Sequence, residues 1–62
     1  MNVKRRKKIE QAIRLLEEAQ YDEQEARENL PENMQDSERA MNMDEAVSNL
    51  EDAVSQAQEA LG

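Results

Sequence analysis

The amino-acid sequence predicts an all-α protein, an antiparallel helical hairpin made of two long helices. The only proline, Pro31, lies at the midpoint of the 62 residues, and the only glycine, Gly62, is the last of them. Both halves of the chain therefore lack the two residues that most often interrupt a helix. Apolar residues recur every seven positions in each half, and no alternation with period two occurs, so strands are not expected.

The first helix is expected at about residues 3–29. Residues seven apart form the a positions of a heptad, and an alanine follows three places after each of the first three. These a positions are Ile9, Leu16, Glu23 and Leu30. Leu30 precedes a proline, where α geometry is disfavoured, so the helix should end near Asn29.

A turn is expected at about residues 30–36 and the second helix at about residues 37–61. Asp36 or Ser37 would cap that helix, because both side chains can accept a hydrogen bond from its first free amides. Alternatively, its start merges with a short helical turn opened by Pro31. The a positions of the second helix are Met43, Leu50 and Ala57.

Every d position in both predicted helices is alanine. Small side chains let two helices approach closely, although alanine is also the best helix former and needs no packing reason. Larger apolar groups also occupy e positions, Ile13 in the first helix and Val47, Val54 and Leu61 in the second, and the resulting arc is wider than a two-helix contact requires. We therefore expect two hairpins to pair as a homodimeric four-helix bundle with coiled-coil packing. The predicted core and dimer seam comprises Ile9, Ala12, Ile13, Leu16, Ala19, Ala26, Leu30, Met43, Ala46, Val47, Leu50, Ala53, Val54, Ala57, Ala60 and Leu61.

Composition argues against an enzyme. The chain has no Cys and no His, so it lacks a His-assisted nucleophile, a disulfide and a Cys/His zinc site. No Gly-rich phosphate loop or Ca²⁺ loop occurs, and its carboxylates are typical of solvated helix faces rather than of a metal pocket. We predict no catalytic, metal or cofactor site. A chain of this size buries only about 60% of its unfolded surface, which favours stabilisation by oligomerisation.

Charge is divided unevenly along the chain. Fifteen acids and eight bases give a net charge of −7, but the first eight residues alone carry +5. This basic run could contact phosphates, yet no aromatic residue interleaves with it for base stacking and the acidic remainder opposes approach to nucleic acid or an anionic membrane. The alternative is a solvated helix start lying near Glu59. The basic run is Lys4, Arg5, Arg6, Lys7 and Lys8.

A partner-binding patch is predicted around Tyr21, the only aromatic residue, which occupies an f position away from the seam. Tyrosine is a preferred interface anchor, and methionine adapts to varied partners. The alternatives are that the methionines pack under the turn and that the acidic faces only keep the protein soluble. The predicted patch comprises Tyr21, Met34, Met41, Glu17, Glu18, Glu25, Glu28, Glu51 and Asp52.

Glu23 is an acid at an a position. It marks either a local break in the seam or a register-setting group that pairs with a cation such as Arg39. No stretch approaches the roughly 18 apolar residues of a membrane span, and the basic start is not followed by an apolar signal core. A cytoplasmic protein without a membrane segment is therefore expected.

Three segments, residues 22–26 (DEQEA), 29–32 (NLPE) and 35–39 (QDSER), together resemble a pattern in small acidic helical proteins of Gram-positive bacteria and their phages. The resemblance extends over about Lys4–Ala60. It implies a phage or mobile-element setting, with the host cytoplasm as location. No activity is established for those proteins, so the resemblance assigns no functional residue.

The sequence thus predicts a non-enzymatic, homodimeric protein-binding module. The phage setting suggests an inhibitor of a host defence or nucleic-acid-processing protein, with the acidic surface imitating a nucleic-acid backbone. Two alternatives stay open: a purely structural oligomerisation module, and a nucleic-acid accessory protein that uses the basic run.

Overall fold

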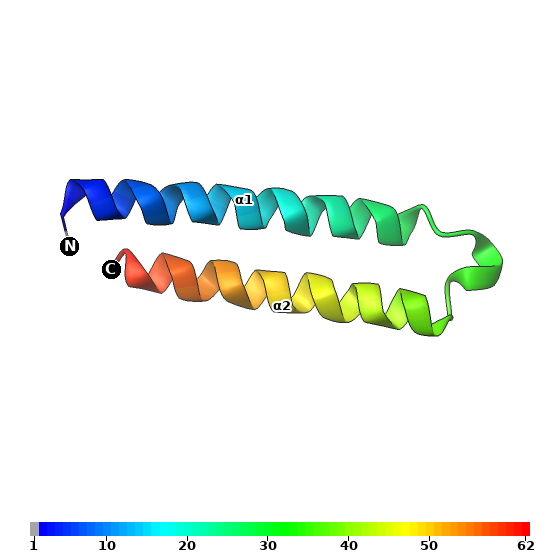
Figure 1. Ribbon diagram of the computed structural model, residues 1–62. Helices are drawn as coiled ribbons and strands as arrows, with labels where there is room; N and C mark the ends of the chain where they lie inside the picture. The colour runs from blue at the N-terminus through cyan, green and yellow to red at the C-terminus, as the bar shows by residue number, and fades with distance from the viewer. Residues whose placement is uncertain (1) are drawn as a thin grey trace.

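The computed structural model describes residues 2–62, which form two long helices joined by a short turn (Figure 1). Helix α1 spans Val3–Glu28, the 3-10 helix η1 spans Glu32–Met34, and helix α2 spans Glu38–Ala60. The two long helices lie side by side and antiparallel, with both chain ends at one end of the hairpin and η1 at the other. These residues contain no strand. The predicted all-α hairpin is therefore confirmed.

The hairpin is a thin rod. Its principal extents are 50 × 14 × 11 Å, and its radius of gyration is 14.6 Å. A compact domain of 62 residues would have a radius of gyration of about 10.6 Å. Only Ile13, Ala40 and Val54 are buried among the described residues, so the single chain has a contact line rather than a globular core.

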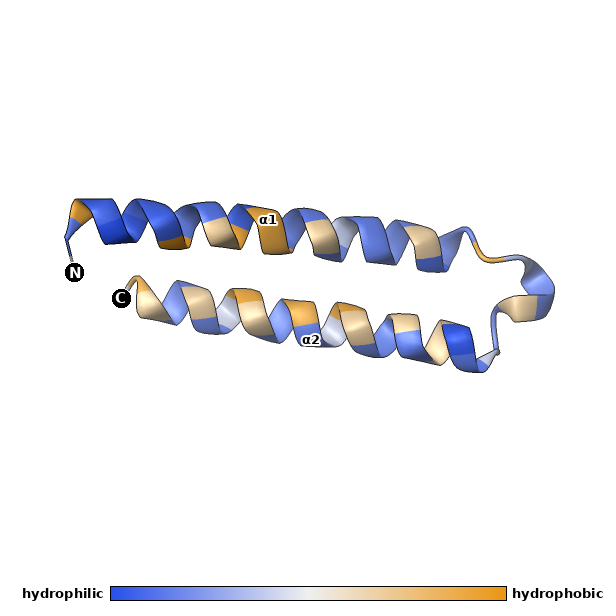
Figure 2. Cartoon of the chain, viewed as in Figure 1, coloured by the Kyte–Doolittle hydropathy of each residue, from blue (hydrophilic) through white to orange (hydrophobic). Residues whose placement is uncertain are grey.

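The contact line has a seven-residue repeat. Residues of α1 with reduced exposure recur at alternating steps of three and four. These residues are Arg6, Ile9, Ile13, Leu16, Gln20, Glu23, Arg27 and, just beyond the helix, Leu30. The first half of this line is mostly aliphatic, whereas Gln20, Glu23 and Arg27 make the second half polar. Figure 2 also shows that apolar residues are few in α1, where most of the helix has hydrophilic colouring, and more frequent along α2.

The line runs through heptad positions a and e, not a and d. The predicted packing of the d-position alanines between α1 and α2 is wrong for the single chain, because Ala12, Ala19, Ala26 and Ala60 are exposed. Ala46 and Ala53 are half-buried. The physical reason is side-chain size. Burying a Val, Leu or Ile side chain gains about 1.5–3 kcal/mol, more than an alanine methyl can supply. The helices therefore turn inward the apolar side chains of their e positions, which are Ile13, Val47, Val54 and Leu61. A role for the alanines in a dimer seam stays a prediction.

Both long helices begin at a side-chain cap. The Asn2 side-chain oxygen accepts a hydrogen bond of 2.9 Å from the Arg5 amide, and the Ser37 hydroxyl accepts one of 3.2 Å from the Ala40 amide. Each cap satisfies an amide that has no partner inside the helix. Ser37, rather than Asp36, is thus the cap of α2. Pro31 immediately precedes η1 instead of being its first residue.

The basic start of α1 is explained by the antiparallel arrangement. Cations at a helix N-terminus oppose the helix dipole, but here they lie beside the C-terminus of α2, where the dipole favours positive charge. Arg6 is half-buried and donates a hydrogen bond of 2.6 Å to the Leu61 carbonyl oxygen. The last turn of α2 contains no basic residue of its own, so α1 supplies the cation that this end lacks.

Within residues 2–62, neither long helix has a stretch that is apolar and long enough to cross a lipid bilayer.

Candidate functional site

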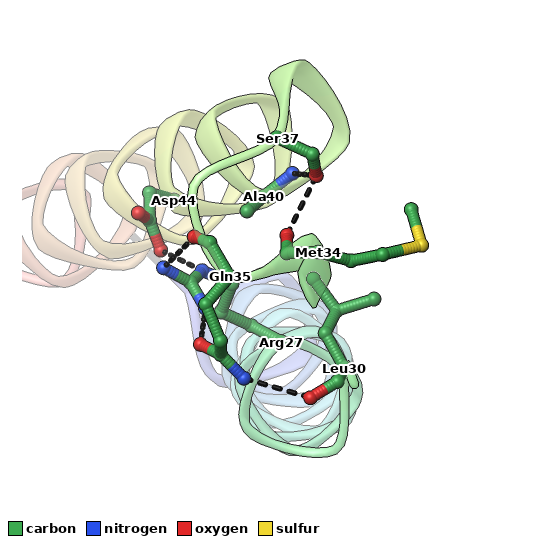
Figure 3. Close-up of polar contacts among 7 residues, drawn as sticks. All are labelled: Arg27, Leu30, Met34, Gln35, Ser37, Ala40 and Asp44. Atoms are coloured by element: carbon green, nitrogen blue, oxygen red, sulfur yellow. Dashed lines mark hydrogen bonds and ion pairs between the residues drawn. The ribbon is translucent and has the colours of Figure 1, made fainter. Parts of the chain in front are cut away.

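An arginine organises the turn end of the hairpin (Figure 3). Arg27 Nε donates to Asp44 Oδ1 at 3.0 Å, and one terminal nitrogen of the same guanidinium donates to the Gln35 carbonyl oxygen at 3.1 Å. The other terminal nitrogen donates to the Gln35 side-chain oxygen. One planar group therefore ties α1 to the turn and to α2 at once, which suits the fixed fork of donors on arginine.

The turn itself is held by two further side chains. The Gln35 side-chain nitrogen donates to the Leu30 carbonyl oxygen at 2.7 Å, and the Ser37 hydroxyl donates to the Met34 carbonyl oxygen at 2.7 Å. These bonds satisfy backbone carbonyls that no helix pairs. We call Arg27, Gln35, Ser37 and Asp44 the turn clasp. It holds the turn against both helices, and it was not predicted from the sequence.

A signal for the clasp was present in the heptad. Arg27 lies fourteen residues after Ile13, at the same e position, so extending the a/e line along α1 places its side chain at the contact with α2. The pairing of Glu23 with Arg39, one of two interpretations of this acid, does not occur within the single chain, and its pairing with a cation of a second copy stays a prediction. Arg27 with Asp44 is the only ion pair within residues 2–62, and Glu23 is half-buried on the contact line without such a partner.

Tyr21 lies on an exposed face of α1, beside two open hollows in the surface. One hollow is lined by Tyr21, Gln24, Glu25 and Glu28, and the other by Glu17, Gln20, Tyr21 and Gln24. The Tyr21 side chain is 68% exposed. We call these six residues the Tyr21 surface. It combines one aromatic ring with three carboxylates, an arrangement suited to contact with a basic protein surface.

Only part of the predicted partner patch lies on this surface. Glu51 of α2 is adjacent, because Gln20 of the Tyr21 surface donates a hydrogen bond of 3.3 Å to its carboxylate. Glu18 and Asp52 are exposed at c positions, on the sides of the two helices that face away from the contact line.

The methionines of the predicted patch lie elsewhere. Met34 is a half-buried residue of η1, and Met41 is 61% exposed in the first turn of α2. Gln20 is bonded to Glu51, whereas Arg27 is bonded to Asp44, so residue numbers in α2 fall toward the turn as those in α1 rise. Met41 therefore lies beyond Asp44, at the turn end, and the structure does not bring it to Tyr21.

The predicted phosphate-contacting run is helical. All five basic residues belong to the first turns of α1, and all are exposed except Arg6, which is engaged by Leu61. Four cations are thus presented at the open end of the rod, on a rigid element.

The carboxylates of residues 2–62 are spread over the rod. Among these residues, no group of three or more acids, cysteines or histidines is positioned to hold a metal ion. The described surface presents three distinct features: the Tyr21 surface, the basic start of α1 and the exposed alanines. Comparison of the chain with protein-family models, curated proteins and solved structures finds no match.

Proposed function

We propose that this chain is a non-enzymatic, cytoplasmic binding module that acts as a homodimer and engages a basic partner protein through the Tyr21 surface. The observation that carries the proposal is the 68% exposed Tyr21 set among Glu17, Glu25 and Glu28 on one rigid helix. Tyrosine gives a large contact area at small entropic cost, and surrounding carboxylates select and steer cationic partners.

The homodimer is supported by how little the single chain buries. Three buried residues in a rod of two helices leave most apolar side chains exposed or half-exposed. Small chains without disulfides or metals commonly obtain their missing core from a second subunit. Two hairpins packed face to face would form a four-helix bundle.

The class of partner follows from charge. The chain carries −7 overall, and its basic residues are concentrated at one end, so the length of α1 around Tyr21 is predominantly acidic. Proteins that bind nucleic acid present basic grooves of matching sign. The resemblance to phage proteins makes a host defence or nucleic-acid-processing protein the partner class that we propose, with the acidic helix standing in for a phosphate backbone.

The test is affinity capture of the tagged protein from a Gram-positive lysate, with and without nuclease, read by mass spectrometry. The patch variant replaces Glu17, Glu25 and Glu28 by Lys. The matched control replaces Glu45, Asp52 and Glu59 by Lys, which makes the same change in net charge on the outer side of α2. We expect one host protein to be captured both after nuclease treatment and by the control variant. The patch variant and Tyr21→Ala should no longer capture it.

A structural module without a third partner is the second candidate, favoured by the sparse core alone. It predicts that capture returns only the protein itself. If capture instead depends on intact nucleic acid and disappears when Lys4, Arg5, Lys7 and Lys8 are replaced by Ala, the basic start is the functional element and the proposal fails.

A further inference from the structure

The d-position alanines of the two helices, exposed except for the half-buried Ala46 and Ala53, lie on one face of the rod. In an antiparallel pair, equivalent heptad positions of both helices fall on the same side of the contact line. Two hydrogen bonds identify one of these sides, because each joins an e residue of α1 to a b residue of α2. They are Gln20 to Glu51 and Arg27 to Asp44, so the b positions lie on one face of the rod. The d positions are on the opposite face. We call this the apolar face; it comprises Ala12, Leu15, Ala19, Ala26, Ala46, Ala53 and Ala60.

The apolar face is accessible and includes one large side chain. Leu15, at the neighbouring g position, is 59% exposed. The whole chain exposes 4917 Å². A compact protein of 7.2 kDa exposes about 4100 Å², so the hairpin has about 800 Å² in excess. A standard stable interface removes about 800 Å² from each partner, which matches that excess.

Charge also distinguishes this face. Between Ala12 and Ala26, its d and g positions contain one charged residue, Asp22, and between Ala46 and Ala60 they contain none. The opposite face carries carboxylates along both helices, including Glu17 and Glu51. Because every copy of the chain has a charge of −7, a second copy meets least repulsion on the apolar face.

The distribution of charge along the rod sets the direction of that second copy. Residues 17–48, the half with the turn, contain eleven acids and two bases, a charge of −9. The other half, residues 1–16 with 49–62, contains six bases and four acids, a charge of +2. An antiparallel pair sets each +2 half beside a −9 half, whereas a parallel pair sets the two −9 halves together.

We infer that the apolar face is covered by a second copy of this chain, lying antiparallel so that the turn end of each hairpin meets the open end of the other. A two-fold axis then crosses α1 between Leu15 and Ala19, where each α1 contacts its own copy. This inference rests on the homodimer of the proposed function and adds its face and direction.

The direction is tested with the native surface intact, since the chain has no cysteine. A single spin label is attached at Lys4→Cys, an exposed site near the open end. Lys4 lies eleven to fifteen residues from the proposed axis, so two labels in an antiparallel dimer should be about 35–45 Å apart at 1.5 Å per residue. A parallel bundle would bring them within about 25 Å, given helix spacings of 8–10 Å, and that result would overturn the inference.

The face is tested by adding charge. Ala19→Glu with Ala53→Glu should make the protein monomeric in sedimentation at concentrations where the native chain is dimeric. The control, Ser48→Glu with Ser55→Glu, adds the same charge to the opposite face and should stay dimeric. A dimer that persists in the alanine variant contradicts the proposed face even if partner capture succeeds. A native chain that is a folded monomer contradicts both this inference and the homodimer of the proposed function.

Discussion

Arg27 near the end of α1 and Asp44 in the second turn of α2 form an ion pair of 3.0 Å that closes the hairpin beside its turn. The two side chains differ in exposure and in the number of their contacts. The Arg27 side chain is 22% exposed and also bonds Gln35, whereas the Asp44 side chain is 59% exposed. Most of the stabilisation should therefore come from the contacts of Arg27 with the turn rather than from the ion pair.

Arg27→Leu should lower the free energy of unfolding by about 1–2 kcal/mol, because it removes three hydrogen bonds made by one charged group. Asp44→Asn should cost less than about 1 kcal/mol, since an exposed ion pair contributes little. Urea unfolding followed by circular dichroism, at one fixed protein concentration, measures both. If both variants lowered the free energy of unfolding equally, the contacts of Arg27 with the turn would not be the main source of stabilisation.

Ser37→Ala should destabilise the protein by about 1 kcal/mol, because the Ala40 amide loses its capping oxygen. The Met34 carbonyl loses its bond from the Ser37 hydroxyl but keeps the one of 3.2 Å from the Ser37 amide. Ser48→Ala, the same change in the exposed middle of α2, is the control and should be neutral or slightly stabilising, because alanine is the better helix former. Thermal unfolding compares the two, and Ser37→Asp should restore most of the loss. An equal effect of both alanine variants would rule out the cap.

Arg6→Ala should loosen the end of α2, because the Leu61 carbonyl loses its bond to the guanidinium and the helix C-terminus loses a nearby cation. Amide hydrogen exchange should become several-fold faster in the last turn of α2 and stay unchanged near the turn clasp. Lys7→Ala removes one exposed charge from the same region and should leave that exchange nearly unchanged. Uniformly faster exchange over both helices would point to a global rather than a local role.

Glu23→Leu should raise the free energy of unfolding by about 1 kcal/mol, because a half-buried acid on the contact line is replaced by an apolar side chain. Glu25→Leu, on the exposed side of the same helix, should give no such gain. Sedimentation of the Glu23 variant should also reveal additional oligomers if the acid restricts assembly. Lower stability together with an unchanged mass would contradict this role for Glu23.

Much of the fold was predictable, because it depends on local chemistry. A single central proline, helices without glycine and a seven-residue apolar repeat are enough to predict two antiparallel helices. Ser37 was one of two predicted caps, and the structure shows its hydroxyl in that role. The exposure of Tyr21 also followed from its f position, away from either possible contact line.

The candidate site was predictable only in part. Tyr21, Glu17, Glu25 and Glu28 share one surface of α1, and their spacing of three and four residues indicates this in the sequence. Met41, which its residue type predicts to be part of the same patch, lies toward the turn on another helix. Residue type alone carries no information about which positions the fold brings together.

The helical hairpin and the approximate bounds of its first helix follow from the sequence alone, since proline and heptad spacing act within a few residues, whereas the sequence left the start of the second helix open between Pro31 and Ser37. Which stripe of each helix faces the other is set by packing between the two helices. A heptad with alanine at d and larger side chains at e permits two rotations about the helix axis, and local rules do not choose between them. The choice depends on the area buried between α1 and α2, which brings Ile13 and Val54 inside and leaves Ala12, Ala19 and Ala26 on the surface.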